Sequence, residues 1–478
     1  MRDRFLQWLR PATYLRGNVL TLFGAALTTS TAITLVAVWL LESTGRSVHP
    51  YAGLVIFVGL PALFVLGLVL MPLGVLLERR KLRARGETLP TRVDFGSAAV
   101  LRALSIVGLL TAVNIALLGI ASYKGIEHME STSFCGATCH VVMQPEYTAF
   151  QVSPHARVAC VECHVGSGAS WFVRSKIAGV RQLIGVTTGH YSRPIPAPVR
   201  PIRPPSDTCE HCHNPQTYAG TRLKVVDKFA DDETNSRSNT VLMLKVGGLR
   251  AGTASGIHGH HLNGGRITYI ATDDKRQVIP RVTVTDASGH ATEYTSTEIK
   301  ATDAELERSE HRVMDCLDCH NRVGHAFAPP ERALDRALAA GQISHELPFV
   351  KREALRLVKA EYADHDRAGQ AIDSELTAFY RDKYPDVFKT KQADVRKAID
   401  SVRQVYASNV FPAMKVGWGT YPNNVGHEEF PGCFRCHDGN HAAPDGRVIS
   451  QDCDSCHNVL AMEEAGPQIL KDLGLAPQ

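Results

Sequence analysis

The sequence of 478 residues lacks a strong charge of either sign, since 52 Lys and Arg face 48 Asp and Glu. A nucleic-acid-binding chain would be expected to show a larger basic excess. The 44% of apolar residues and the ordinary content of glycine and proline exclude a disordered or collagen-like chain. Cysteine is scarce too: twelve Cys at this length are too few for a disulfide-dense scaffold, so their spacing must indicate their role.

Charged residues are missing altogether from three long stretches near the N-terminus, residues 17–41, 51–77 and about 103–122. Each stretch can cross a hydrocarbon core of about 30 Å as a helix that rises about 1.5 Å per residue. We therefore expect a membrane anchor of three transmembrane helices within residues 1–122. A cleaved signal peptide is the alternative for the first stretch, but this stretch is unusually long and no clear cleavage site follows it.

Basic residues set the expected orientation of this anchor. Four Arg precede the first stretch and seven Lys or Arg separate the second from the third, whereas the loop between the first two carries only Arg46. The positive-inside rule then places the N-terminus in the cytoplasm of a bacterium, with the anchor in the inner membrane. Everything after about residue 123 is expected to lie in the periplasm.

All twelve Cys follow the anchor and form six pairs, each with a His directly after the second Cys. Cys-x-x-Cys-His is the attachment signature of c-type haem, in which the two sulfurs form thioethers with the porphyrin and the His binds the iron. The first pair has three intervening residues instead of two. The six motifs are Cys135/Cys139/His140, Cys160/Cys163/His164, Cys209/Cys212/His213, Cys316/Cys319/His320, Cys433/Cys436/His437 and Cys453/Cys456/His457.

Zinc binding and dithiol redox chemistry are the other common uses of a Cys pair. Neither use requires a His after every second Cys, and no Cys is left over. We therefore expect six covalently bound c-type haems, attached on the outer side of the membrane.

Six irons need up to six further axial ligands, and 15 His lie outside the motifs. Imidazole is the usual second ligand of electron-transfer haems, and the thioether of Met143, three residues after His140, is an alternative for the first iron. The cluster Gly-Ile-His-Gly-His-His at 256–261 could supply one ligand or merely lie in a turn. The other distal candidates are close to a motif in the sequence; the full set is Met143, His155, His258, His311, His325, His427 and His441.

The segments between the motifs differ in residue composition and in the spacing of apolar residues. Residues 222–300 alternate β-branched and polar side chains, which predicts a small antiparallel β insertion. Residues 331–410 show helical spacing of apolar residues and predict amphipathic helices, and residues 411–478 hold the last two motifs. The expected fold is mainly α: a three-helix membrane anchor and a multihaem cytochrome c domain rich in short helices and loops.

The order of the motifs resembles that of the NapC/NirT/NrfH family of membrane-anchored cytochromes. A membrane helix, a first motif with Met143 nearby, Ser-Pro-His155 and Cys-Val-Glu-Cys163-His164 follow one another, and Gly-His325 trails the fourth motif. The resemblance implies a tetrahaem quinol dehydrogenase module over residues 123–330, in which His325 is a distal ligand.

Three features depart from the usual pattern of this family. The first motif has an extra residue, Met143 falls one position late, and two additional membrane helices precede the module. Larger relatives with extra helices and a Cys-Phe-Arg-Cys-His-Asp-Gly-x-His motif, matched here by residues 433–441, are a closer likeness. The departures leave both a Met143 thioether and an imidazole as candidate ligands of the first iron.

The resemblance also implies quinol oxidation near the first haem, followed by electron transfer outward. Lys176 falls where the family carries a basic residue near the quinol, so Lys176 and Met143 mark the expected quinol site. Contact with the membrane interface or with a haem propionate is the alternative role of Lys176. Glu127, Glu130 and Glu146 are further candidates to accept protons.

These observations predict a membrane-anchored hexahaem cytochrome, a quinol dehydrogenase that draws electrons from the menaquinol or another quinol pool. Its expected partners are the quinone pool, the lipid bilayer, and periplasmic cytochromes or a terminal reductase, with no nucleic acid. Two alternatives stay open. One is a relay subunit of a respiratory complex without its own quinol site, and the other is a haem reductase of a small oxyanion such as nitrite.

Overall fold

The computed structural model describes residues 19–43, 59–86, 113, 116–117, 119–120, 123–138, 140–165, 169–199, 203–214, 220–250 and 253–475. The chain divides into two compact units, Met1–Thr138 and Cys139–Gln478. The division falls inside the first haem motif, between its two cysteines.

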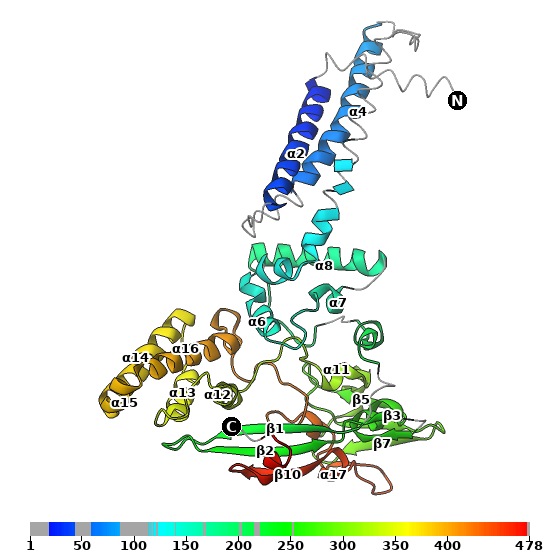
Figure 1. Cartoon of the computed structure of the whole chain (residues 1–478). Coiled ribbons are helices and arrows are strands. Elements are labelled where there is room, and N and C mark those ends of the chain that lie inside the picture. The colour runs from blue at the N-terminus through cyan, green and yellow to red at the C-terminus, as the bar shows by residue number, and fades with distance from the viewer. Residues whose placement is uncertain are drawn as a thin grey trace. The chain divides into compact units, whose positions relative to one another are not determined.

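Two long apolar helices, α2 (Val19–Ser43) and α4 (Leu60–Ala84), dominate the first unit (Figure 1). Within the described residues, these two helices are long and apolar enough to cross a membrane. They run antiparallel, because Thr21 lies beside Gly74 whereas Gly24 lies beside Gly67. The third helix, expected over about 103–122, lies mostly outside the described residues.

Small side chains let α2 and α4 approach closely. A Cβ atom on Gly67 would lie 2.8 Å from the carbonyl oxygen of Gly24 and would also collide with the hydroxyl of Thr28. That hydroxyl donates to the Gly24 carbonyl oxygen at 2.8 Å, so it leaves no polar group unsatisfied. Such close contact is typical of helix pairs in lipid, where packing rather than a hydrophobic driving force holds helices together.

The second unit starts with the helices α6 (His140–Gln151), α7 (Cys160–His164) and α8 (Ala169–Thr188) and the 3-10 turns η4 (Pro205–Asp207) and η5 (Cys209–His211). The remaining motifs lie in η9 (Gly432–Arg435), α11 (Cys316–Cys319) and α17 (Cys453–Cys456). Short elements suit these segments, because covalently held cofactors take the place of an apolar core.

Antiparallel strands form two larger sheets and one hairpin. The three-stranded sheet has the order β1 (Arg222–Phe229), β2 (Arg237–Leu244), β10 (His457–Glu464). The five-stranded sheet has the order β8 (Glu310–Val313), β5 (Arg266–Ala271), β6 (Arg281–Thr285), β7 (Ala291–Ser296), β9 (His441–Ala442). The hairpin pairs β3 (Gly248–Arg250) with β4 (Thr253–Ser255).

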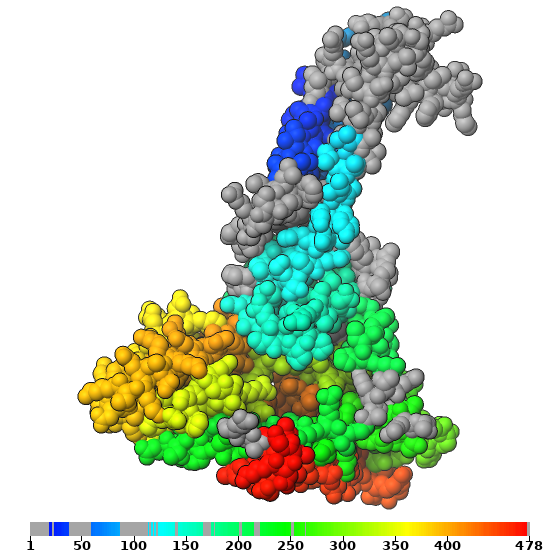
Figure 2. Space-filling model, viewed as in Figure 1, coloured from blue at the N-terminus to red at the C-terminus, as the bar shows by residue number. Residues whose placement is uncertain are grey.

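The β structure is larger than the small insertion expected over 222–300, and that expectation was wrong in extent. Strands β8, β9 and β10 come from segments beside the fourth, fifth and sixth motifs and pair with strands of the insertion. In Figure 2 the red surface of the C-terminal residues adjoins the green surface, in agreement with the pairing of β10 with β2. Edge strands of this kind form because a partner strand offers hydrogen bonds, so short ones such as β9 leave little local signal.

Helices α12 (Pro330–Ala339), α13 (Val350–Val358), α14 (His365–Lys383), α15 (Pro385–Thr390) and α16 (Gln392–Asn409) pack on one another. Their apolar residues recur three and four positions apart and therefore share one face. The largest apolar core of the described residues lies between these faces and includes Leu334, Leu357, Ile372, Tyr380 and Val402. The backbone amide of Phe229 in β1 donates to Asp335 of α12 at 3.1 Å, which joins the helices to the sheet (Figure 1).

Candidate haem sites

Each haem motif that the structure describes in full forms about one turn of helix. In the third, fourth and fifth motifs, the amide of the motif His donates to the carbonyl of the first Cys four residues earlier. Residues four apart on a helical turn lie on the same side, so the first Cys and the His project together. The three N to O distances are 2.8 Å for His213, 2.7 Å for His320 and 3.0 Å for His437.

Five of the motif thiols have surroundings that disfavour thiolate. Burial raises the pKa of Cys316 and Cys319 to about 11 and that of Cys436 to about 12, and it also raises the pKa of Cys163 and Cys456. A zinc site or a reactive dithiol needs the thiolate form. In the absence of a bound group these thiols are therefore protonated and not poised for dithiol redox chemistry.

Cys212, predicted to bind the third haem together with Cys209, is an exposed motif thiol. Cys163, Cys433 and Cys453 are exposed as well, whereas Cys209 is partly buried. The Cys212 amide donates to the Cys209 carbonyl oxygen at 3.1 Å, so the backbone of the turn still has the shape of the other motifs. An exposed thiol adds no support of its own for haem attachment. The assignment of Cys212 therefore depends on its place in the motif and stays a prediction.

A second imidazole lies opposite the motif His in the second, third, fourth and sixth motifs. Metal–imidazole bonds are about 2 Å long, so two rings on opposite sides of one metal ion have centres about 6 Å apart. The four observed separations of ring centres match this value. They are 6.1 Å for His164–His325, 6.1 Å for His213–His155, 6.2 Å for His320–His258 and 6.1 Å for His457–His427.

Several of these rings are held as neutral imidazole, the form that binds metal. Burial lowers the pKa of His164, His320 and His457, and the facing imidazole lowers each of them further. The Nδ1 of His325 lies 2.9 Å from the carbonyl oxygen of Glu146. A carbonyl at Nδ1 selects the tautomer that leaves Nε2 free for a metal.

Two of the paired rings retain a buried nitrogen that the protein does not satisfy. The Nδ1 atoms of His155 and His457 have no hydrogen-bond partner among the described residues. Buried polar atoms are normally paired, and exceptions point to a group that completes the site. The unpartnered Nδ1 atoms leave the tautomers of these two rings open, and it is the four ring separations that fit a haem iron with two imidazole ligands.

Not every distal candidate lies beside a motif. The Nε2 of His311 lies 3.0 Å from the carbonyl oxygen of Leu306. His441 is fully buried, and protein groups occupy both nitrogens: Nδ1 lies 2.9 Å from Asp438 Oδ1 and Nε2 lies 2.7 Å from the Ile279 carbonyl oxygen. Within the described residues the structure brings neither ring against a motif His.

The side chains expected at the first haem and the quinol site are only partly described. Met143 lies half-buried in α6, three residues after the start of that helix at His140. The backbone of Lys176 lies in the middle of α8. The side chains of His140 and Lys176, and all of Cys139, lie outside the description.

The fifth motif faces two histidines rather than one. The ring of His437 has its centre 6.2 Å from that of His260 and 5.8 Å from that of His261. His261 is anchored, because its Nδ1 lies 2.8 Å from the Ile257 carbonyl oxygen, and burial lowers its pKa to about 4. The sequence suggested one ligand from this cluster, whereas the structure directs His258 to the fourth motif and its neighbours to the fifth.

Substitutions should separate the two neighbours. We expect His261→Ala to convert one haem from low-spin to high-spin, because His261 is the ring whose Nδ1 is held by a carbonyl. His260→Ala is the matched control and should leave the spin state unchanged. Electron paramagnetic resonance of the oxidised protein gives the answer, and a high-spin signal in the His260 variant alone would reverse the assignment.

The second to sixth motifs follow one another in space in the order of the sequence. Their thiols are close enough for the charge on one to raise the pKa of the next. The pairs whose charges interact are Cys163 with Cys209, Cys209 with Cys316, Cys319 with Cys433, and Cys433 with Cys456.

A linked series of Cys-x-x-Cys-His turns with facing imidazoles defines a multihaem c-type cytochrome, a class of electron-transfer proteins. Residues 97–194 match the NapC/NirT cytochrome c family, N-terminal region. The chain is 40% identical over 450 residues to the cytochrome c-type protein ImcH of Geobacter sulfurreducens, an alignment covering 93% of this chain and 88% of that protein. The chain therefore belongs to the NapC/NirT cytochrome c family, as the motif order indicated.

A more distant similarity covers the first motifs. The chain is 27% identical over 127 residues to the cytochrome c-type protein NrfH of Wolinella succinogenes, which covers 26% of this chain and 70% of that protein. No solved structure matches the chain.

Proposed function

We propose that this protein is a membrane-anchored hexahaem cytochrome that oxidises menaquinol or another quinol. It passes the electrons to periplasmic cytochromes or a terminal reductase. The observation that supports this proposal most is the continuous series of motifs, from the second to the sixth, that each face an imidazole. The series begins in the segment that matches the NapC/NirT family, and resemblance to this family implies quinol oxidation. When bound, each haem supplies an iron that takes up and releases one electron. The protein's own contribution is to hold neutral imidazoles in place and to keep the motifs adjacent.

The histidine pairs suggest a ligand for each of five irons. The motif His is the proximal ligand, and the facing ring is the distal one. The proposed pairs are His164 with His325, His213 with His155, His320 with His258, His437 with His261, and His457 with His427. Because each pair offers two imidazoles, the arrangement favours electron transfer over reduction of nitrite, which needs an open iron.

Quinol oxidation releases two electrons and two protons, so the quinol site needs a proton acceptor. Glu146 is engaged already, because its carboxylate pairs with the buried Arg322 at 3.1 Å. Glu127 pairs with Lys124 at 2.7 Å on an exposed surface. Lys176 and Met143 remain the proposed residues of the quinol site.

The surroundings of Lys176 support a location at a lipid surface. Helix α8 exposes a stripe of apolar side chains, Ile177, Val180 and Ile184, at helical spacing. Arg174 and Arg181 lie on the same helix. An exposed apolar stripe with basic residues is typical of a helix that lies in a membrane interface, next to the bilayer in which quinol is dissolved. The proposed topology keeps the N-terminus in the cytoplasm and the haem domain in the periplasm of the inner membrane.

A reduction assay tests this function. Purified full-length protein in detergent should be reduced rapidly by a menaquinol analogue, seen as the rise of the reduced α-band. Lys176→Met should slow this reduction by at least about tenfold if Lys176 takes part in proton transfer, whose usual contribution is about 10²–10⁴-fold. Lys397→Met, at an exposed position of helix α16, is the matched control and should have no effect.

The outcomes separate the alternatives. If dithionite reduces the protein but the quinol analogue does not, the protein is a relay that receives electrons from another subunit. If nitrite or hydroxylamine changes the haem spectrum, an open iron exists and the reductase alternative gains support.

A further inference from the structure

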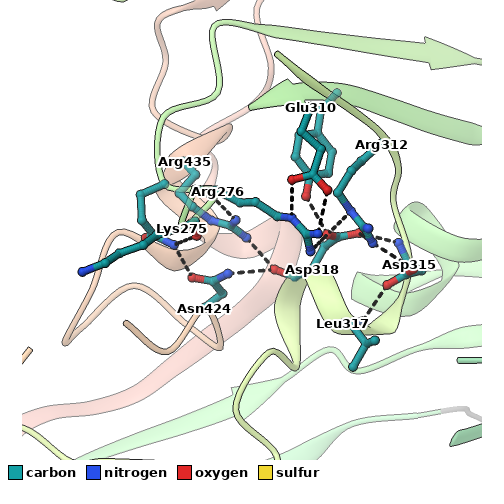
Figure 3. Close-up of polar contacts among 11 residues, drawn as sticks. Lys275, Arg276, Glu310, Arg312, Asp315, Leu317, Asp318, Asn424 and Arg435 are labelled. Atoms are coloured by element: carbon teal, nitrogen blue, oxygen red, sulfur yellow. Dashed lines mark hydrogen bonds and ion pairs between the residues drawn. The ribbon is translucent and has the colours of Figure 1, made fainter. Parts of the chain in front are cut away.

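Arg435 connects two haem motifs that are far apart in the sequence. It is a middle residue of the fifth motif, Cys433-Phe-Arg-Cys436, and its guanidinium is buried. Its Nη2 donates to the carbonyl oxygen of Asp318 at 2.7 Å, and Asp318 is a middle residue of the fourth motif (Figure 3). The attachment turns of the fourth and fifth motifs are therefore bonded directly to each other.

The other donors of Arg435 strengthen this link. Nη1 donates to the carbonyl oxygen of Arg276 at 2.8 Å, and Nε donates to that of Gly432 at 2.8 Å. Arg276 has a φ of 56°, a left-handed conformation that is unfavourable for a residue with a side chain. Such strain persists only where the surrounding contacts hold it, and here the strained residue presents its carbonyl to Arg435.

The carboxylate of Asp318 organises the other side of the link. Only 1% of this side chain is exposed. It accepts a hydrogen bond from Arg312 Nε at 2.8 Å, and Arg276 Nη1 lies 3.7 Å away (Figure 3). The Tyr269 hydroxyl also donates to it, at 2.5 Å. It also accepts from the backbone amide of Asp315 at 2.8 Å, which caps the turn α11 that carries the fourth pair of thiols.

The cluster around this link is balanced in charge. The arginines Arg276, Arg312 and Arg435 match the acids Glu310, Asp315 and Asp318 in number. Buried charges act over longer distances than exposed ones because little water screens them. Loss of one arginine would leave a net negative charge between two haem sites.

A second buried arginine repeats the arrangement at an earlier pair of motifs. Arg203 donates through Nη1 to the carbonyl oxygen of Glu162 at 3.1 Å, and Glu162 occupies in the second motif the position that Asp318 occupies in the fourth. Its Nη2 donates at 2.5 Å to the carbonyl oxygen of Asp207, two residues before the third motif. A buried guanidinium therefore bridges neighbouring attachment turns at two places in the described residues.

We propose that Arg435 is a positioning residue that locks the fifth haem site onto the fourth and gives the two sites a shared electrostatic environment. The link joins the part of the chain that resembles the tetrahaem module to the C-terminal segment with the last two motifs. This inference rests on the proposed hexahaem function and names the contact through which that function extends beyond the fourth haem.

A redox titration of the full-length, haem-loaded protein tests the proposal. A positive charge stabilises the reduced haem, so Arg435→Gln should lower the midpoint potentials of two haems together and leave the other four unchanged. Arg435→Lys keeps the charge but cannot donate to both carbonyls in the same geometry, so the same two haems should shift less. Arg447→Gln is the matched control, because Arg447 is exposed and pairs with Asp445 in the same C-terminal segment.

Arg435→Lys and the milder Asn424→Ala, which removes a 3.0 Å hydrogen bond to the same Asp318 carbonyl, serve if Arg435→Gln does not fold. The same two haems should respond in each variant. A shift of a single haem, no shift, or an equal shift of all six would overturn the proposal. The titration uses chemical mediators and no quinol, so its result is independent of the quinol assay; a mass showing fewer than six haems in the unaltered protein would count against the hexahaem function instead.

Discussion

Replacing His325 with alanine should convert one haem from low-spin to high-spin in a protein that keeps all its haems. The ring of His325 faces that of His164 at 6.1 Å, and its Nδ1 is held by the carbonyl of Glu146. Thioether bonds would retain the porphyrin, so only the distal ligand is lost. The low-spin signal in electron paramagnetic resonance should lose the share of one haem, and the affected potential should move, since ligand identity tunes haem potentials over a range of about 0.8 V.

His311→Ala is the matched control for this substitution. His311 was an equally plausible ligand from the sequence, but its Nε2 contacts the Leu306 carbonyl and, within the described residues, no motif imidazole. The control should keep its full low-spin signal. If His311→Ala produced the high-spin haem and His325→Ala did not, the proposed ligand pairs would be wrong.

The sequence predicted the haem motifs themselves because their chemistry is local. Two thiols and an imidazole within one turn of helix are enough to define an attachment site, and no distant residue is needed. Two of the three apolar stretches form long apolar helices in the described residues, as predicted, because the length of a membrane span is set by the bilayer. For the same reason, the family membership could be inferred from motif order alone.

The histidine pairs could not be assigned from the sequence because they form across the fold. His155 precedes the second motif in sequence but faces His213 of the third. His325 trails the fourth motif but faces His164 of the second. Nearness in sequence identified both as candidates, yet the partner of each depends on how loops far apart in the chain meet.

Buried charges were the other feature hidden from the sequence. Charged side chains usually face solvent, so the sequence analysis did not identify Asp318 and Arg435 as buried partners. The available signal was their opposite charge at middle positions of consecutive motifs. The strands β8 and β9 were missed for a related reason, since only their pairing partners make them strands.

Replacing Lys351 with alanine should lower the free energy of unfolding by about 3–5 kcal/mol, the usual effect of removing one partner of a buried ion pair. The Nζ of Lys351 pairs with Asp335 and donates to the Glu331 carbonyl oxygen at 2.9 Å. The same carboxylate accepts the backbone amide of Phe229 and so joins the helices to the sheet. Without Lys351, the buried carboxylate of Asp335 would lose the cation that pairs with it.

Lys359→Ala is the matched control, because Lys359 pairs with Glu331 on the neighbouring surface with about half of each side chain exposed. Exposed pairs contribute about 0–1 kcal/mol, so the control should unfold almost as the unaltered protein does. Thermal unfolding followed by far-ultraviolet circular dichroism measures the difference. Equal losses of unfolding free energy in the two variants would show that burial of the Lys351 pair does not add to its contribution to stability.

A double variant isolates the cause. Lys351→Met with Asp335→Asn removes both charges, keeps an apolar stem in place of the lysine, and retains an oxygen to accept the Phe229 amide. Most of the lost stability should return, because replacing a whole buried ion pair is far less harmful than breaking it. If the double variant were no more stable than Lys351→Ala, the loss would come from packing of the lysine stem rather than from an uncompensated charge.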